Sequence, residues 1–295
     1  MEMVGEDVII ENQKDSDLFK DIEEKVLKEF HWGVDLKCLE VLDGNETTPD
    51  QIELLKEKLS QEMLTRLFGM ANSVYYGKLR KGEISTFHEV VLRLGMVYTK
   101  TFIIASSLFS LVPGKGAEIF AARSFATSIL ARILGQKLGF RSEEVQKAEL
   151  GGLFFDVGRI VIYIYQTFHS KQPLEERFIE AYHPYLGVEI IRQFELPEFL
   201  KEIISPHPFS LHDESFSISA IVDLAYAIVD RSFIRNEKLI IQSPLPDKEG
   251  FVIHTLGSMI SDEFSTIGLG RYLELIPSLS DRELRLQARA KSDEK

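Results

Sequence analysis

Cysteine is almost absent from the sequence. Cys38 is the single cysteine among 295 residues, so no disulfide can form within the chain and no site can be built from several thiolates. This scarcity is typical of proteins that work in a reducing compartment, and we expect a cytoplasmic protein. The first residues carry Glu2, Glu6 and Asp7 without a basic stretch ahead of an apolar one. They therefore do not resemble a signal peptide.

Long apolar runs and an excess of positive charge are also lacking. The longest apolar run, residues 102–112, is interrupted by three serines and is much shorter than the roughly 20 residues that a membrane helix needs. There are 34 Lys and Arg against 46 Asp and Glu, a formal net charge of −12. Binding to nucleic acids or to anionic lipid surfaces requires clustered positive charge. We therefore expect neither a nucleic-acid partner nor a membrane partner.

Helical periodicity dominates what is present. Hydrophobic residues make up 44% of the chain, which is enough for a globular core. From residue 15 onward, most segments place apolar side chains three and four positions apart, the spacing of one buried helix face. The pattern predicts an all-α protein. One stretch disagrees, because residues 160–165 are β-branched and aromatic and their propensity favours a strand.

The sequence Pro113-Gly114-Lys115-Gly116 is the strongest break inside the helical pattern, since proline and glycine both interrupt helices. It predicts two packed helical halves, residues 15–112 and 117–235. Residues 1–14 show no helical period, and we expect a flexible N-terminal arm there.

The last part of the chain, residues 236–295, is predicted to be a C-terminal helical extension. Two helices are expected over 251–266 and 270–290. Between the main domain and these helices we expect a loop over 236–250, with a weak strand signal at 239–241 where the residues are Leu-Ile-Ile.

Residues 67–96 form the stretch around which the first half is organised. An apolar helix face leads into Asn72, where a polar side chain is costly unless it is hydrogen-bonded. The string ANSVYYG follows, then Ile84, then VVLRLGM. Thr86 and Glu89 have the spacing of a capping box, so they predict a helix start between them.

This stretch resembles the signature of the HDOD family, bacterial helical domains related to the HD-type metal phosphohydrolases. The signature positions are Asn72, Ser73, Tyr76, Gly77, Leu94 and Gly95. Further pieces follow in family order, namely RSFA, GGLFFDVGR, HPYLG and LPEFLKEIISPHP. The resemblance covers roughly residues 15–235 and implies a multi-helix architecture like that of HD domains, with residues 160–165 in a helix.

The resemblance also identifies where metal ligands would stand. HD phosphohydrolases hold one or two metal ions with histidines and carboxylates, and the metal activates water and polarises phosphate. Here three of those positions keep a ligand type, and they are Asp156, His183 and His207. Three others have lost it, and they are Arg123, Phe155 and Tyr226. None of the seven histidines forms an HExxH pattern.

The resemblance therefore implies a vestigial metal centre. A cation at position 123 opposes metal binding because like charges repel strongly in a partly buried pocket. We expect no cofactor and no bound metal, and we expect Asp156 to pair with Arg123 or with a histidine in the helical core.

The favoured function is a non-catalytic bacterial signal-transduction domain that acts through contacts with an unidentified signalling protein. The first alternative is a metal-dependent phosphohydrolase acting on a nucleotide or a cyclic dinucleotide, with Asp156, His183 and His207 as ligands. The second alternative is a pocket that binds a nucleotide without cleaving it, in which Arg123 would bind a phosphate.

Overall fold

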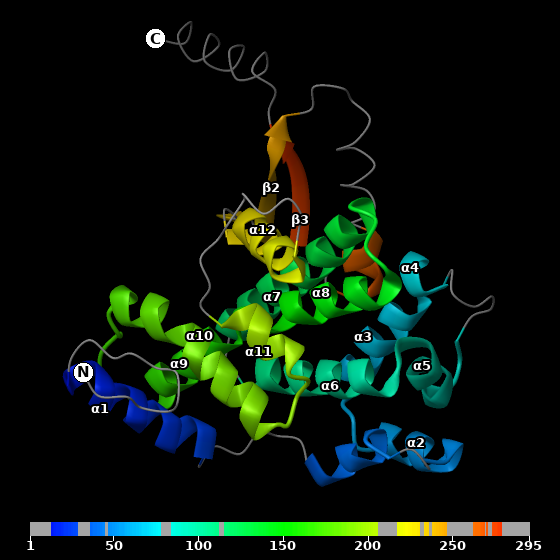
Figure 1. The fold of residues 1–295 in the computed structure, drawn as a ribbon, viewed down its shortest axis with the longest axis horizontal. Coiled ribbons are helices and arrows are strands. Elements are labelled where there is room, and N and C mark those ends of the chain that lie inside the picture. Colours follow the sequence, from blue (N-terminus) through cyan, green and yellow to red (C-terminus); the bar gives the residue numbers. More distant parts are fainter. Residues whose placement is uncertain are drawn as a thin grey trace, which may run out of the picture.

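Helices form the body of the molecule in the computed structural model (Figure 1). The structure describes residues 13–28, 36–44, 47–77, 84–111, 115–205, 217–230, 233–235, 238–246, 262–268, 270 and 273–278. Most of the expected N-terminal arm, the position of His207 and the residues 251–261 and 279–290 lie outside these ranges. Gln13 and Lys14, which we assigned to the arm, are instead the start of the first helix.

The helices follow one another along the chain with short connections. They are α1 (Gln13–Ile22), the π-helix η1 (Glu23–Lys28), the 3-10 helix η2 (Leu36–Leu42), α2 (Pro49–Lys56), α3 (Gln61–Asn72), α4 (Val74–Gly77), α5 (Phe87–Leu94), α6 (Met96–Ser110), α7 (Lys115–Lys137), α8 (Ser142–Phe154), α9 (Val157–Phe168), α10 (Glu176–Gln193), α11 (Phe199–Ile204) and α12 (Ile218–Asp230). The all-α prediction is confirmed for this body. The helix expected over 160–165 is also confirmed, since α9 contains it.

Local capping explains where several helices begin. The Thr86 side chain accepts a hydrogen bond from the Glu89 backbone at 3.2 Å, and the Glu89 carboxylate accepts one from the Thr86 backbone at 2.9 Å. The same reciprocal box joins Thr48 and Gln51 at the start of α2. These bonds satisfy backbone donors that a helix start otherwise leaves unpaired.

The apolar residues of both helical halves form one continuous buried cluster. α7 packs along α8, α9 packs along α10, and α12 lies across α7 and α8. α6, almost entirely buried, contacts α7, α8 and α9. The two halves are thus joined through α6, and α7 begins at Lys115, two residues earlier than expected.

A small sheet follows the last long helix (Figure 1). β1 (Phe233–Arg235) pairs antiparallel with β2 (Lys238–Pro246), and β2 pairs parallel with β3 (Leu273–Ser278). The strand signal at 239–241 is confirmed by β2, but the loop expected over 236–250 is wrong at 238–246, where the chain is a strand. The helix expected over 270–290 is wrong at 273–278, because Pro277 disfavours a helix interior and is tolerated on an edge strand such as β3.

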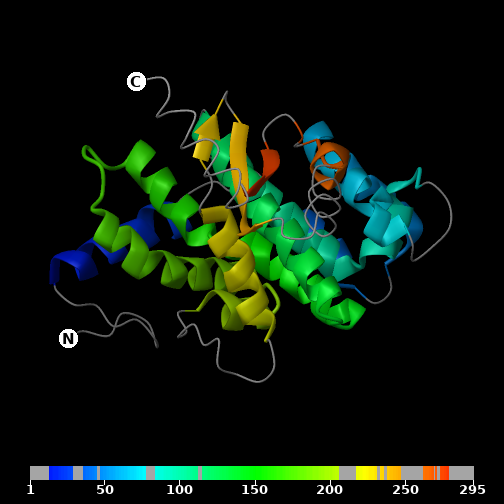
Figure 2. The same ribbon diagram turned by 90° about the horizontal axis from the view of Figure 1, so that it is seen from above.

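The same part of the chain contains a helical turn at residues 262–268, which packs against α3 (Figure 2). Across the described ranges, no single helix has the length and apolarity to cross a membrane. The consecutive helices α5 and α6 reach that length and composition only as a pair, with a bend of 108° between them.

Glu89 makes the stability of α5 depend on pH. Backbone hydrogen bonds from Ser85 and Thr86 lower the pKa of the Glu89 carboxyl from 4.5 to about 2. A depressed folded-state pKa contributes stability above the unfolded pKa, and that stability is lost as the pH falls through the folded value. We therefore expect Glu89→Gln to lower the free energy of unfolding at pH 7, with the deficit shrinking between pH 4.5 and about 2.

Urea unfolding at several pH values measures this dependence. Glu57→Gln is a matched control, because Glu57 is an exposed carboxylate outside any capping box. A deficit for Glu89→Gln that stays constant over the acidic range would contradict the assignment.

Candidate functional site

The positions that correspond to the HD metal centre come together from four parts of the fold. Arg123 lies on α7, Phe155 and Asp156 form the junction between α8 and α9, His183 lies on α10 and Tyr226 on α12. His207, the third expected ligand, lies outside the described residues. The fold therefore gathers five of the six predicted positions around one centre, although they are far apart in the sequence.

A close helix contact positions Asp156 beside His183. A Cβ atom on Gly158, in the first turn of α9, would lie only 1.7 Å from the backbone oxygen of His183. Only glycine allows the two helices to approach this closely. As a result, Asp156 Oδ1 lies 3.9 Å from His183 Nδ1.

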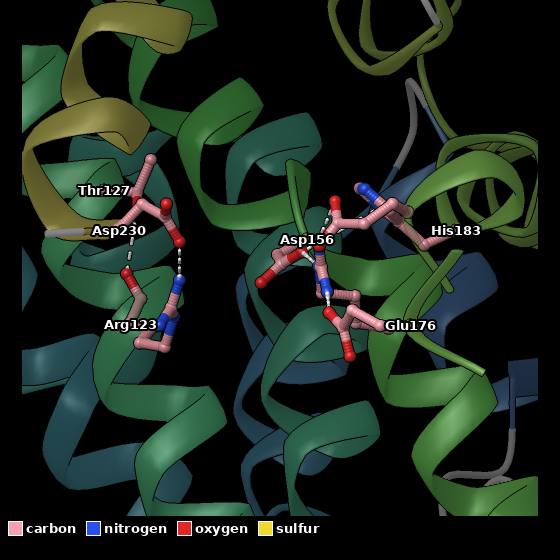
Figure 3. A network of polar contacts seen from close by, with 8 residues as sticks. Arg123, Thr127, Asp156, Glu176, His183 and Asp230 are labelled. Carbon is pink, nitrogen blue, oxygen red and sulfur yellow. Dashed lines mark hydrogen bonds and ion pairs between the residues drawn. The ribbon is translucent and has the colours of Figure 1, made fainter. Parts of the chain in front are cut away.

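Arg159 is the direct partner of Asp156. Its Nε lies 2.7 Å from Asp156 Oδ1, and its terminal nitrogens lie 2.6 Å from Glu180 Oε2 and 3.6 Å from Glu176 Oε1. Figure 3 shows Asp156, Glu176 and His183 together in one group of side chains. The centre therefore contains a cation, and that cation is a side chain of the protein itself.

Burial sets the protonation of the two family ligands. It raises the pKa of Asp156 to about 6, while the charges of Arg159 and Arg123 oppose the rise. Burial, followed by the charge of Arg159, lowers the pKa of His183 to about 3. At neutral pH His183 is therefore uncharged, and its contact with Asp156 is not an ion pair.

Arg123 forms a separate pair on the other side of the centre. Its terminal nitrogen lies 2.8 Å from Asp230 Oδ1, and its guanidinium lies 6.0 Å from the ring centre of Tyr226. Figure 3 shows the Arg123–Asp230 pair apart from the Asp156 group. The expected pairing of Asp156 with Arg123 is wrong, because Arg123 pairs with Asp230. The expected histidine, His183, is a neighbour of Asp156 at 3.9 Å, but the closer partner is Arg159 at 2.7 Å, one helical turn away.

Aromatic rings occupy two positions where HD enzymes have ligands. The rings of Phe155 and Tyr226 lie 4.6 Å apart at an interplanar angle of 44°. Tyr226 is partly buried, and burial raises the pKa of its hydroxyl to about 12. It therefore stays neutral and offers a metal no anionic ligand.

A metal ion does not fit the side chains that are present. Within the part of the chain that the structure describes, no three His, Cys, Asp or Glu side chains converge as metal ligands. Asp156 and His183 supply two donor groups, and the guanidinium of Arg159 already lies against one of them. A divalent cation at this point would be repelled by Arg159 at short range.

The signature residues have structural roles at some distance from this centre. Asn72 Oδ1 accepts a hydrogen bond from the Ile84 backbone at 3.0 Å, and its amide donates to the Ile84 carbonyl at 3.5 Å. The requirement for a hydrogen-bonded Asn72 is thus met, although its side chain is exposed. Gly95 has a φ of 92°, which favours glycine and turns the chain from α5 into α6 just after the buried Leu94. Ser73 Oγ accepts from the Tyr76 backbone at 3.5 Å.

Tyr76 belongs to a second polar cluster that sequence reasoning missed. Its hydroxyl donates to Glu149 Oε2 at 2.6 Å. Glu149 Oε1 lies 3.0 Å from Arg132 Nε, and another nitrogen of Arg132 lies 3.0 Å from Glu263 Oε2. All four side chains are buried. No local motif signals this cluster, because its members come from α4, α8, α7 and the turn at 262–268.

The contact at Gly158 predicts a change in the free energy of unfolding that is opposite in sign to the change that helix propensity predicts. Glycine to alanine in a helix interior is ordinarily favourable by about 1 kcal/mol. Gly158→Ala should instead lower the free energy of unfolding by about 2 kcal/mol or more, because the added methyl group meets the backbone of α10. Gly135→Ala is the matched control, since its Cβ would lie 3.4 Å from the Val145 side chain. Denaturant unfolding of both variants measures the difference, and an unchanged or raised stability of Gly158→Ala would refute the contact.

The chain is similar to known helical proteins over most of its length. A family model described as the HDOD domain matches residues 36–208. The crystal structure of a protein named "Putative metal-dependent phosphohydrolase" from Shewanella amazonensis SB2B has a TM-score of 0.60 at 14% identity, covering 88% of this chain and 98% of that one. An HDOD domain protein with unknown function from Geobacter sulfurreducens has a TM-score of 0.48 at 18% identity, with coverage of 88% and 89%. No curated protein matches the chain.

Proposed function

The chain belongs to the HDOD domain family, and on that premise we propose that it is a non-catalytic regulatory protein of bacterial signal transduction. In this proposal it acts by contact with a separate signalling protein. The chain shares its fold with a protein named as a metal-dependent phosphohydrolase. The argument against catalysis is the set of side chains around Asp156, which pairs with Arg159. A fold can persist after the chemistry of its ancestral site has been lost.

The observation that carries the proposal is the position of Arg159. Metal-dependent hydrolysis needs a cation that can lower the pKa of bound water and polarise the phosphate. A guanidinium is permanently charged and has no vacant coordination position, so it performs neither task. Its ion pair with Asp156 at 2.7 Å removes the carboxylate that is most needed as a ligand.

The charges around the centre also disfavour an anionic substrate. Among the described residues, the four carboxylates of Asp156, Glu176, Glu180 and Asp230 pair with two guanidinium groups, those of Arg123 and Arg159. Arg123 is already paired with Asp230, so it is not available to a phosphate without breaking that pair. This balance makes nucleotide binding at Arg123 the weaker alternative.

Metal analysis of the purified full chain tests the proposal. We expect much less than one equivalent of any transition metal in the wild type, with no difference from Asp156→Ala, and no hydrolysis of phosphoester substrates with added Mn²⁺ or Mg²⁺. A stoichiometric metal that Asp156→Ala loses would instead support the phosphohydrolase alternative. In that case His207 would be the first additional ligand to test.

The role of Arg159 can be measured independently as a stability effect. Arg159→Met leaves the buried Asp156 carboxylate without its ion-pair partner, and we expect a loss of about 2 kcal/mol at pH 8. This is below the 3–5 kcal/mol of fully buried pairs because Arg159 is partly exposed. The double variant Arg159→Met with Asp156→Asn should recover part of that loss, since the unpaired charge is gone. Arg141→Met, which breaks an exposed pair with Glu144, should change stability by less than about 0.5 kcal/mol. Independent, additive effects of the two substitutions would contradict the pairing.

A further inference from the structure

The helical turn at residues 262–268 packs on the helical body from outside the segment that the family model matches. That segment ends at residue 208. Figures 1 and 2 both place the turn, in orange, beside α3, which is drawn in blue to cyan. Phe264 and Ile267 are buried against the body, with 0% and 1% of their surface exposed. Asp262, Ser265 and Thr266 face outward.

The backbone of the turn touches the backbone of α3 at Gly69. A Cβ atom at Gly69 would lie 2.3 Å from the carbonyl oxygen of Thr266. Contacts of this length are impossible for any residue with a side chain. The surface of α3 is therefore shaped to receive a helical turn at this point.

The body offers the turn a buried positive charge. Arg132, 2% exposed, lies 3.0 Å from Glu263 of the turn. The body already supplies Arg132 with Glu149, also at 3.0 Å, and Tyr76 hydrogen-bonds to that carboxylate. Arg132 therefore keeps an ion-pair partner when the turn is withdrawn.

Two carboxylates share this single guanidinium. Burial raises the pKa of Glu149, and the charge of Glu263 adds to the rise while Arg132 opposes it. The negative charge of Glu263 is thus attracted by Arg132 and repelled by Glu149. Removal of Glu263 leaves Arg132 paired with Glu149.

A cavity of about 500 Å³ continues the contact surface along α3. Its lining comes mainly from the outward face of α3, with one lysine of α2 and one residue of the turn, and comprises Lys56, Gln61, Leu64, Thr65, Phe68, Gly69, Asn72 and Thr266. The surface that receives a helix is therefore longer than the turn that occupies it, and Lys56 adds positive charge along it.

We propose that Gly69, Arg132 and the adjoining cavity form a docking seat for an acidic helical segment of a partner protein, and that the turn at 262–268 is a built-in occupant which the partner displaces. The partner segment carries glutamate, an aromatic residue directly after it and an apolar residue four positions after the glutamate, as Glu263, Phe264 and Ile267 do. This inference rests on the proposed role in protein contacts and specifies the chemistry of the partner.

Because the turn at 262–268 occupies the docking seat, a partner segment must compete with it for binding. A tethered segment has an effective concentration near the millimolar range, so a free segment of the same sequence binds poorly while the internal one is intact. Weakening the internal turn lowers that competition without altering the seat. Phe264→Ala does this, because Phe264 belongs to the turn and not to the seat.

The test uses a fluorescent peptide that copies residues 260–270, titrated into the full chain and followed by anisotropy. We expect Phe264→Ala to bind the peptide at least tenfold more tightly than the wild type. Gly69→Ala releases the internal turn too, but its methyl group blocks the seat, so it should bind no better than the wild type. In the peptide, Glu263→Gln should weaken binding to Phe264→Ala protein at least fivefold, whereas Asp262→Asn should change it less than twofold.

The proposal is overturned if cooperatively folded Phe264→Ala binds the peptide no better than the wild type, or if Gly69→Ala binds it equally well. Equal binding of the Glu263→Gln and unchanged peptides also overturns it. If Phe264→Ala does not fold, hydrogen exchange of the wild-type protein measures instead whether the turn can be displaced. Amides of 264–267 that exchange at least tenfold faster than those of α7 support a displaceable turn, and equal rates overturn it. The peptide-binding and exchange results do not depend on the metal content of the protein. Failure of the docking proposal can therefore be distinguished from failure of the proposed non-catalytic function.

Discussion

The buried ion pair between Arg132 and Glu149 is the interaction on which the arrangement of this protein depends. Both side chains are withdrawn from water, 2% and 0% exposed, and that withdrawal is costly unless their remaining polar atoms are satisfied. Tyr76 of the signature stretch supplies a hydrogen bond to the carboxylate. The pair on α7 and α8 lies in the second helical half, and Tyr76 ties it to the first half. Glu263 extends the connection to the turn at 262–268.

The centre around Asp156 also balances a buried carboxylate with a guanidinium. Asp156 lies directly after α8, and a guanidinium from the next helix neutralises it. In an HD enzyme a metal ion would balance such a carboxylate and would also bind water. Arg159 supplies the charge balance alone. The packing at Gly158 brings Asp156 and His183 together. It also holds α9 against α10, and this role needs no metal.

The two clusters suggest a division of labour within the molecule. The centre at Asp156 is closed by ion pairs and by the rings of Phe155 and Tyr226, and it holds the second helical half together. Gly69 of α3 and Arg132 of α7 both contact the turn at 262–268, which is the described segment that covers them. In the regulatory role proposed above, the first region would serve as a rigid frame and the second as the surface whose contacts are exchanged.

The sequence by itself determined the helical class and the helix start at Thr86. These features depend on local spacing, because caps act over three residues and an apolar helix face repeats every three to four. Tertiary structure alone decided which cation balances Asp156, which carboxylates share Arg132, and which strand pairs with 273–278. Each of these is a choice among partners that folding brings together from distant segments. Nothing in the spacing of Arg132, Glu149 and Glu263 distinguishes them from solvated surface charges, because burial and distance exist only once the helices have packed.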